Sequence, residues 1–230
     1  MESPLSPHHV MKRSRHAGVT LLELLVVMAI IGILSTVIIV SQSTFNKTVL
    51  LSSAAYDVAL AIRSTETFGL GSRVTESDTY TNSGYGIHFV ADAPTFLIFV
   101  DNDPPANGCH TLPVTGASSP AAIPGNCMYI PASSPPTDPT VQTYTLGNRV
   151  NITNLCIYSN SSKWQCNKSS LNIVSSRPNT TTYLSVGGEA YNQSYTKAYL
   201  TLASTQGGEA SVCIYTTGIV SLVSDPQLQC

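Results

Sequence analysis

The feature that most constrains this chain is a run of 22 residues from Val19 to Val40 in which Glu23 is the only charge. As an α-helix, at 1.5 Å per residue, the run would be about 33 Å long, which is enough to cross the hydrocarbon core of a bilayer. A carboxylate at that depth costs about 2.5–3.5 kcal/mol on insertion scales. A chain that keeps Glu23 there is therefore expected to supply a partner for it.

The residues before this run are polar and basic, and Lys12, Arg13 and Arg15 lie just ahead of it. A basic flank is typically retained in the cytoplasm, so the rest of the chain is expected to face outward. An ordinary secretory signal has a shorter apolar region followed by a cleavage site between small residues. A plain single-span anchor would explain the length of the run, but it would leave Glu23 unexplained.

The stretch "AGVTLLELLVVMAIIGIL" resembles the class III signal of type IV pilins and type II secretion pseudopilins. That signal has a short basic leader, a glycine at the cut, a threonine and then a glutamate after it, and a long apolar helix. The resemblance implies that a prepilin peptidase cuts after Gly18 and that the new amine of Val19 is N-methylated. The leader would be lost and the apolar helix kept.

The resemblance also assigns Glu23, with Thr20, to subunit assembly. In the family, the glutamate pairs with the N-terminal amine of a neighbouring subunit, and such neutralisation is strong where the dielectric constant is low. Two departures from the usual pattern stand out. Val19 occupies the position where phenylalanine is usual, and the first proline after the cut is Pro94, so the apolar helix lacks a proline kink.

The helical pattern continues beyond the apolar run. Two apolar stripes recur at three- and four-residue spacing, and small alanines would let a sheet approach closely. The first stripe contains Phe45, Val49, Ser52, Tyr56 and Leu60, and the second contains Leu51, Ala55, Val58 and Ile62. We predict one helix from Val19 to about Gly69, ended by Gly69 or Gly71 as a left-handed cap. The expected parts are a cleaved leader (1–18), a transmembrane or filament-core helix (19–42), an amphipathic continuation (43–70) and an extracytoplasmic head (71–230).

From Ser72 onward, short segments rich in Val, Ile, Tyr, Phe and Thr alternate with turn residues, which is typical of strands. The predicted strands are "YGIHFV", "TFLIFV", "VQTYTLG", "RVNITNLCIY", "SLNIVSS", "AYLTLAS", "ASVCIYT" and "GIVSLV". Because the helix comes first and the strands follow it, we expect an α+β fold with an antiparallel sheet. A Pro-rich segment, residues 101–139, is expected to form an exposed loop tied by a disulfide.

All six cysteines lie beyond the predicted helix, between residues 109 and 230, without the spacing of a metal cluster, and predict disulfides in an oxidising compartment. Six cysteines allow fifteen pairings. We favour nearest-neighbour pairing, which joins Cys109 to Cys127, Cys156 to Cys166 and Cys213 to Cys230. The rival arrangement joins Cys156 to Cys213 across adjacent strands.

Other candidate chemistry is weak. Asp101, Asn102 and Asp103 gather oxygen ligands as a calcium loop does, but prolines interrupt the loop and its distant glutamate is missing. No G-x-S-x-G elbow or phosphate loop is present, so we expect no enzyme activity and no cofactor. The net charge of −2 gives no general case for nucleic-acid binding. Five tyrosines leave open a stacking surface for DNA or glycans, against ordinary sheet packing: Tyr80, Tyr85, Tyr191, Tyr195 and Tyr199.

The predicted function is a type IV pilin-like prepilin, a structural subunit of an extracytoplasmic filament. Its expected partners are the prepilin peptidase, other pilin or pseudopilin subunits, an inner-membrane assembly platform and, before assembly, the bacterial inner membrane, spanned once with the N-terminus in the cytoplasm. The segments "AAYDVALAIRSTETFGLGSRV", "YGIHF", "RPNTTTYLSVGG" and "ASVCIYTTGIVSL" resemble H-type minor pseudopilins and FimU-type minor pilins, in which an Arg-Pro strand and a final hairpin close the head. A minor subunit is therefore favoured. The alternatives are a major shaft subunit and a membrane-anchored adhesin that does not polymerise.

Overall fold

A computed structural model describes residues 19–71, 84–101, 109, 125–131, 138–147, 149–160, 163–176, 181–187, 189, 194–223 and 230, without the side chains of residues 40–46. The expected leader and most of the Pro-rich segment lie outside these residues. The chain divides into two compact units, residues 1–44 and 45–230. One helix, α1 (Leu21–Gly71), runs through both of them. Its start lies two residues after the expected start at Val19.

In the first unit, the stretch Leu21–Ile39 is long and apolar enough to cross a membrane, with a mean hydropathy of 2.7 and none of it buried. Its large side chains are open to the surroundings, Leu21 and Ile33 among them. An apolar surface of this extent requires lipid or other protein to cover it.

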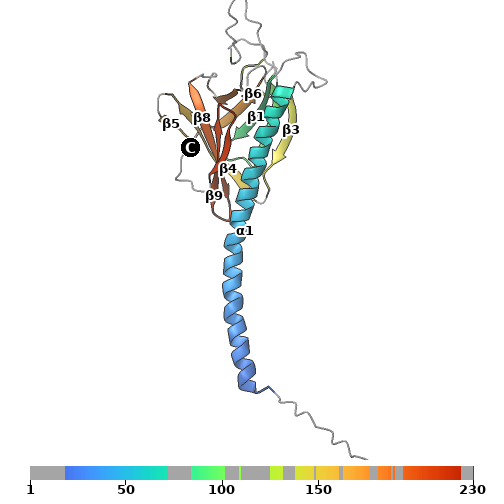
Figure 1. The fold of residues 1–230 in the computed structure, drawn as a ribbon, viewed down its shortest axis with the longest axis vertical. Helices are drawn as coiled ribbons and strands as arrows, with labels where there is room; N and C mark the ends of the chain where they lie inside the picture. The colour runs from blue at the N-terminus through green and yellow to red at the C-terminus, as the bar shows by residue number, and fades with distance from the viewer. Residues whose placement is uncertain are drawn as a thin grey trace, which may run out of the picture. The chain divides into compact units, whose positions relative to one another are not determined.

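In the second unit, α1 lies along the strands of the head (Figure 1). It buries only one of its two apolar stripes there. Leu51, Ala55, Val58 and Ile62 are buried in the core of the head, and Ala54 and Ala61 lie beside them. The other stripe remains open, because Val49, Tyr56 and Leu60 keep 48%, 60% and 63% of their surface exposed. The continuation of the helix is therefore apolar on two sides, and the head covers only one.

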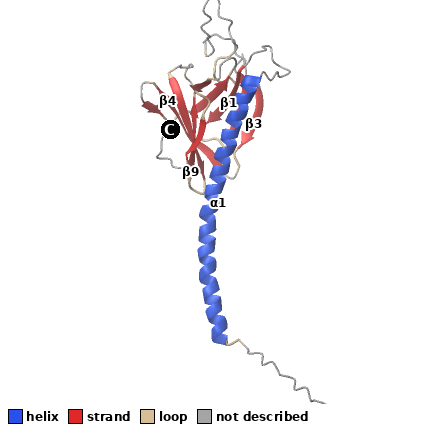
Figure 2. Ribbon diagram, viewed as in Figure 1, coloured by secondary structure: helices blue, strands red, loops and turns tan. Residues whose placement is uncertain are grey.

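Among the described residues, the head contains ten strands in two antiparallel sheets. Figures 1 and 2 show how the strands and α1 are arranged. The first sheet has the order β3-β2-β1-β6-β7 and the second the order β10-β9-β8-β4-β5. The strands are β1 (Gly84–Val90), β2 (Thr95–Asp101), β3 (Thr140–Thr145), β4 (Val150–Ser159), β5 (Lys163–Gln165), β6 (Ser170–Ser175), β7 (Thr182–Val186), β8 (Tyr195–Ser204), β9 (Glu209–Tyr215) and β10 (Val220–Val223).

One hydrophobic core joins the helix to both sheets. Alternate residues of the first sheet, such as Ile87 and Ile98, and of the second, such as Leu155 and Leu200, bury their side chains with those of α1. The sheets are also linked through backbone hydrogen bonds, because the turn between β1 and β2 pairs with Ile152 of β4: Asp92 donates to its carbonyl and Ile152 donates to Ala93. The α+β class with an antiparallel head is thus present as expected.

Three details differ from the expectations. The short strand β5 was not predicted, because three residues show no period, whereas β7 agrees with the strand that the resemblance placed in its segment. Within the Pro-rich segment, residues 125–127 are buried rather than exposed. Neither Gly69 nor Gly71 adopts a left-handed backbone; Gly69 instead lets α1 approach β6, since a Cβ there would lie 2.2 Å from the carbonyl oxygen of Ser175.

This contact predicts opposite effects for two glycines of the same helix end. Gly69→Ala should lower the free energy of unfolding by about 1–3 kcal/mol, because the added methyl group overpacks the junction with β6. Gly71→Ala is the matched control, because no described atom beyond its own helix backbone and chain neighbours lies within 4 Å of the added Cβ, and it should be neutral or slightly stabilising. Denaturant unfolding of the full-length chain in detergent measures both. Equal effects of the two substitutions would contradict the close approach.

Candidate functional site

The start of α1 is defined by the side chain of Thr20. Val19 and Thr20 are exposed and not helical, and Leu21 is the first helical residue. The Thr20 hydroxyl oxygen accepts the backbone N–H of Glu23 at 3.2 Å, and its carbonyl accepts that of Leu24 at 3.1 Å. These two bonds make Thr20 the N-cap of the helix, and the Thr-x-x-Glu spacing is that of a capping box.

Glu23 occupies the third helical position, where a negative charge interacts favourably with the helix dipole. It is the only acidic residue in the first turn and is exposed. Of the four residues assigned to processing and assembly, Val19, Thr20 and Glu23 fall within five residues at this end of α1, whereas Gly18 lies outside the described residues. The pairing of Glu23 with an amine of another subunit stays a prediction.

The six cysteines form three disulfides, each between nearest neighbours in the chain: Cys109–Cys127, Cys156–Cys166 and Cys213–Cys230. The rival pairing assumed that Cys156 and Cys213 lie on adjacent strands, and this assumption is wrong. Strand β8 separates β4 from β9, and Tyr199 stands in register between the two cysteines.

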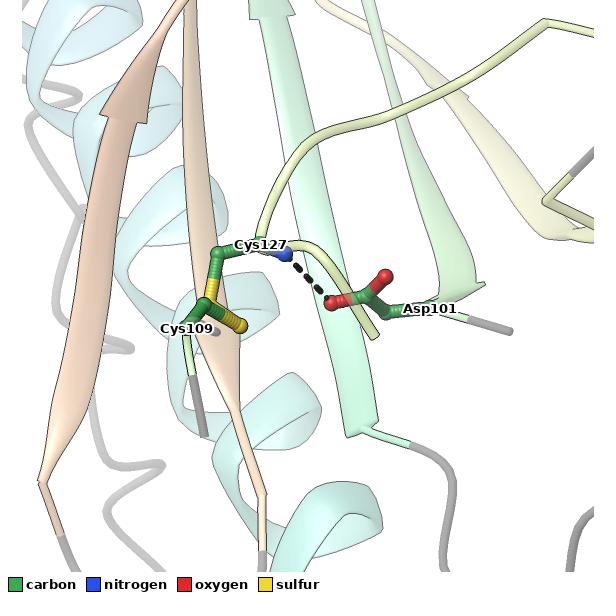
Figure 3. A group of neighbouring side chains, drawn as sticks. All are labelled: Asp101, Cys109 and Cys127. Atoms are coloured by element: carbon green, nitrogen blue, oxygen red, sulfur yellow. Dashed lines mark hydrogen bonds between the residues drawn. A yellow bond between two sulfur atoms is a disulfide. The ribbon is translucent and has the colours of Figure 1, made fainter. Parts of the chain in front are cut away.

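The first disulfide holds a segment, residues 125–131, which we call the strap and whose first three residues are buried. The carboxylate of Asp101, at the end of β2, accepts the backbone N–H of Asn126 at 2.9 Å. It also accepts that of Cys127 at 2.8 Å, the bond drawn in Figure 3. Gly125 is required beside it, since its φ is +126° and a Cβ would lie 2.6 Å from an oxygen of Asp101. A carboxylate that accepts two backbone donors is a strong, charge-assisted anchor.

The strap contacts Asp101, one of the three residues considered as candidate calcium ligands. Asp101 lies with Cys109 and Cys127 in a group close enough to bind a metal ion, but the two sulfur atoms are joined to each other and provide no thiolate. Both oxygens of Asp101 bind backbone donors of the strap. Asn102 and Asp103 lie outside the described residues, so the expectation that these three residues bind no calcium stays a prediction.

Sequence reasoning missed a row of polar side chains on the face of the first sheet opposite α1. His88 Nδ1 lies 2.6 Å from the side-chain oxygen of Asn172. The amide nitrogen of Asn172 donates to the Ser185 hydroxyl at 3.1 Å, and that hydroxyl donates to the carbonyl of Cys127. The three residues are neighbours in register across β1, β6 and β7. No local signal marks this row, because its members are far apart in the chain.

The row also sets the ionisation of His88. Because Asn172 uses its amide nitrogen on Ser185, its oxygen is free to accept, and we assign the proton of neutral His88 to Nδ1. Burial lowers the pKa of His88, an effect that the hydrogen bond to Asn172 partly opposes. The ring also lies against that of Tyr129 of the strap, with 4.8 Å between centroids and an angle of 41° between the ring planes.

The tyrosines proposed for stacking are divided by the structure. Tyr85 and Tyr195 are buried, which favours sheet packing, and Tyr80 and Tyr191 lie outside the described residues. Tyr199 is half-buried, and its ring lies 4.9 Å from that of Trp164, which also contacts Tyr158. The ammonium group of Lys197 lies over the rings of Tyr158 and Trp164 and donates to the carbonyl of Cys230. This group therefore makes its contacts within the head.

Comparison with known proteins gives one match. Residues 13–39 match the prokaryotic N-terminal methylation motif, the class III signal of type IV pilins. No curated protein and no solved structure matches the chain. The signal therefore connects this chain to type IV pilins, and the match includes Gly18, Val19, Thr20 and Glu23 but no part of the head.

The Asp101 anchor gives a prediction for stability. Asp101→Asn should lower the free energy of unfolding by about 1–3 kcal/mol, because an amide presents only one acceptor and leaves a strap N–H without a partner. Asp92→Asn is the matched control, since Asp92 is exposed and has a φ of 60°, which asparagine tolerates. Urea unfolding of the full-length chain in detergent measures both. Wild-type stability of Asp101→Asn would show that the strap does not depend on the carboxylate.

The lowered pKa of His88 predicts a pH dependence. Protonation is easier in the unfolded chain, where the pKa is about 6.5, so the contribution of neutral His88 is complete above that value and decreases as the pH falls below it. Between about pH 7.5 and 5.5, the wild type should therefore lose stability more steeply than His88→Gln. Glu66, whose pKa is raised by burial, acts in the opposite direction at lower pH. Parallel melting-temperature profiles of the two proteins would contradict this role of His88.

Proposed function

We propose that this chain is a type IV pilin-like prepilin, a non-enzymatic structural subunit of an extracytoplasmic filament. The proposal rests on three features that occur together at the N-terminal end of α1. The N-terminal methylation motif covers residues 13–39, the helix there is apolar and uncovered, and its single carboxylate lies one turn after the expected cut.

Processing comes first in this proposal. A prepilin peptidase cuts after Gly18 on the cytoplasmic side, where Lys12, Arg13 and Arg15 hold the leader. The new amine of Val19 is then N-methylated. Val19 is exposed and not helical, which suits it to both reactions. The apolar stretch Leu21–Ile39 keeps the processed subunit in the membrane until it is assembled.

Assembly then exchanges lipid for protein around the same apolar surface. Glu23 pairs with the Val19 ammonium group of a neighbouring subunit, so that neither charge enters the apolar bundle alone. Leaving one buried charge unpaired costs several kcal/mol, which makes the pairing a condition for docking and a marker of axial register. The exposed stripe of Val49, Tyr56 and Leu60 provides a further apolar surface for neighbouring subunits.

Within this class we place the chain among minor subunits rather than shaft subunits. Helix α1 contains no proline between Leu21 and Gly71, so it lacks the kink that many major pilins carry. Between β2 and β3 lies a Pro-rich segment of a length unusual for a connection, and disulfide Cys109–Cys127 closes it. The ratio of this chain to its filament partners separates the two roles, because a shaft subunit dominates the filament by mass.

Substitutions at Glu23 test the assembly step. Glu23→Gln keeps a polar side chain at the third helical position but removes the charge, and Glu23→Ala removes both. We expect both proteins to be cleaved and retained in the membrane, with more than about tenfold less protein in sheared filaments than wild type, because the Val19 ammonium group loses its counter-charge. Immunoblots of the membrane and filament fractions measure the difference.

Gly18→Leu is the control for this experiment, because it should leave the leader uncut and show the position of unprocessed protein on the same blot. Wild-type amounts of Glu23→Gln in filaments, together with loss of Glu23→Ala, would assign Glu23 to helix capping instead of charge pairing. Cleavage of Gly18→Leu at the wild-type rate would remove the assigned processing site.

A further inference from the structure

We propose that Thr20 is a positioning residue for processing: its hydroxyl fixes the first helical residue at Leu21 and so keeps the backbone at the scissile bond available to the peptidase. This inference rests on the proposed function. It assigns Thr20, until now grouped with Glu23 in assembly, to the preceding step. The hydrogen bond from the Glu23 N–H to the Thr20 hydroxyl, at 3.2 Å, is the contact that carries it.

An N-cap determines which carbonyl accepts the first helical hydrogen bond. In the structure this is the carbonyl of Thr20, which accepts the N–H of Leu24 at 3.1 Å. Val19 and Thr20 consequently stay outside the helix and exposed. The bond to be cut precedes Val19, two residues before the first helical residue, Leu21.

Without the hydroxyl of Thr20, the next capping residue upstream is Gly18. Valine at position 19 is a poor N-cap, whereas glycine is an acceptable one. A helix capped by Gly18 would include Val19 and Thr20, and the Gly18 carbonyl would accept the N–H of Leu22. That carbonyl belongs to the scissile bond itself. A peptide carbonyl held in a helix must first be released by local unfolding before a protease can bind it.

Substitutions that separate capping from size test this role. Thr20→Ser and Thr20→Asn keep a side-chain acceptor, Thr20→Val keeps the shape of threonine without one, and Thr20→Ala removes both. The full-length proteins are incubated in detergent with purified prepilin peptidase. We expect kcat/KM of Thr20→Ser and Thr20→Asn within about twofold of wild type. For Thr20→Val and Thr20→Ala we expect kcat/KM to decrease by about 2- to 30-fold, which corresponds to the range of stability lost when an N-cap is replaced.

Hydrogen exchange gives a second measurement that does not depend on the peptidase. The amide of Leu22 has no helical acceptor when the helix is capped by Thr20, and it gains one if the cap moves to Gly18. Exchange at Leu22 should therefore slow in Thr20→Val and remain at the wild-type rate in Thr20→Ser, as measured by NMR in detergent.

The outcomes separate this inference from the function on which it depends. Cleavage of Thr20→Val at the wild-type rate would overturn the positioning role and leave the prepilin function intact. Equally slow cleavage of Thr20→Ser, Thr20→Asn and Thr20→Val would have the same consequence. A wild-type chain that the peptidase does not cut would overturn the proposed function itself. Slow cleavage of Thr20→Val together with slow hydrogen exchange at the Leu22 amide supports both the positioning role of Thr20 and the prepilin function.

Discussion

One continuous helix has to satisfy two different surroundings, and the rest of the chain follows from that constraint. In Leu21–Ile39 almost every side chain is apolar and none of the stretch is buried within the chain. Where water is excluded, the backbone must satisfy its own hydrogen bonds, and a helix does so. Further along the same helix, a stripe of small and branched residues becomes the centre of a globular core. The absence of proline in α1 allows one element to serve both purposes.

The head is built to fit that second part of the helix. Alanines on the buried stripe and Gly69 at its end bring α1 close to the strands, and alternate residues of both sheets complete the core. The opposite face of the first sheet has its own small cluster, in which Phe99, Val174 and Tyr183 pack on the Cys109–Cys127 disulfide. The strap, anchored by Asp101, covers that face. Packing on both faces of the first sheet thus holds the strap against the head.

The helix, nearly all strands and the apolar segment could be predicted from sequence, because each has a local period or length that the residues themselves display. The start and the end of the helix were harder to predict from the sequence. The beginning at Leu21 depends on one hydroxyl group, and the role of Gly69 depends on Ser175, more than a hundred residues away. Periodicity also could not tell which of two apolar stripes on α1 faces the core, since both have the required spacing.

The polar groups of the head were the least predictable part. Asp101 reads as a calcium ligand in its local context, whereas its backbone partners lie 25 and 26 residues later. His88 and Asn172 are 84 residues apart and meet only because β1 pairs with β6. For the cysteines, sequence could rank the pairings, but the separation of Cys156 from Cys213 by β8 follows from the order of the strands.

In our proposal, Glu23 and Thr20 belong to a subunit whose N-terminus is created by cleavage after Gly18. Mass spectrometry of the N-terminal peptide, taken from protein in the filament fraction of the native host, is the most direct test. We expect a peptide that begins at Val19 and carries one added methyl group on its amine. A peptide that begins after the apolar stretch, or one that retains the basic leader, would contradict it.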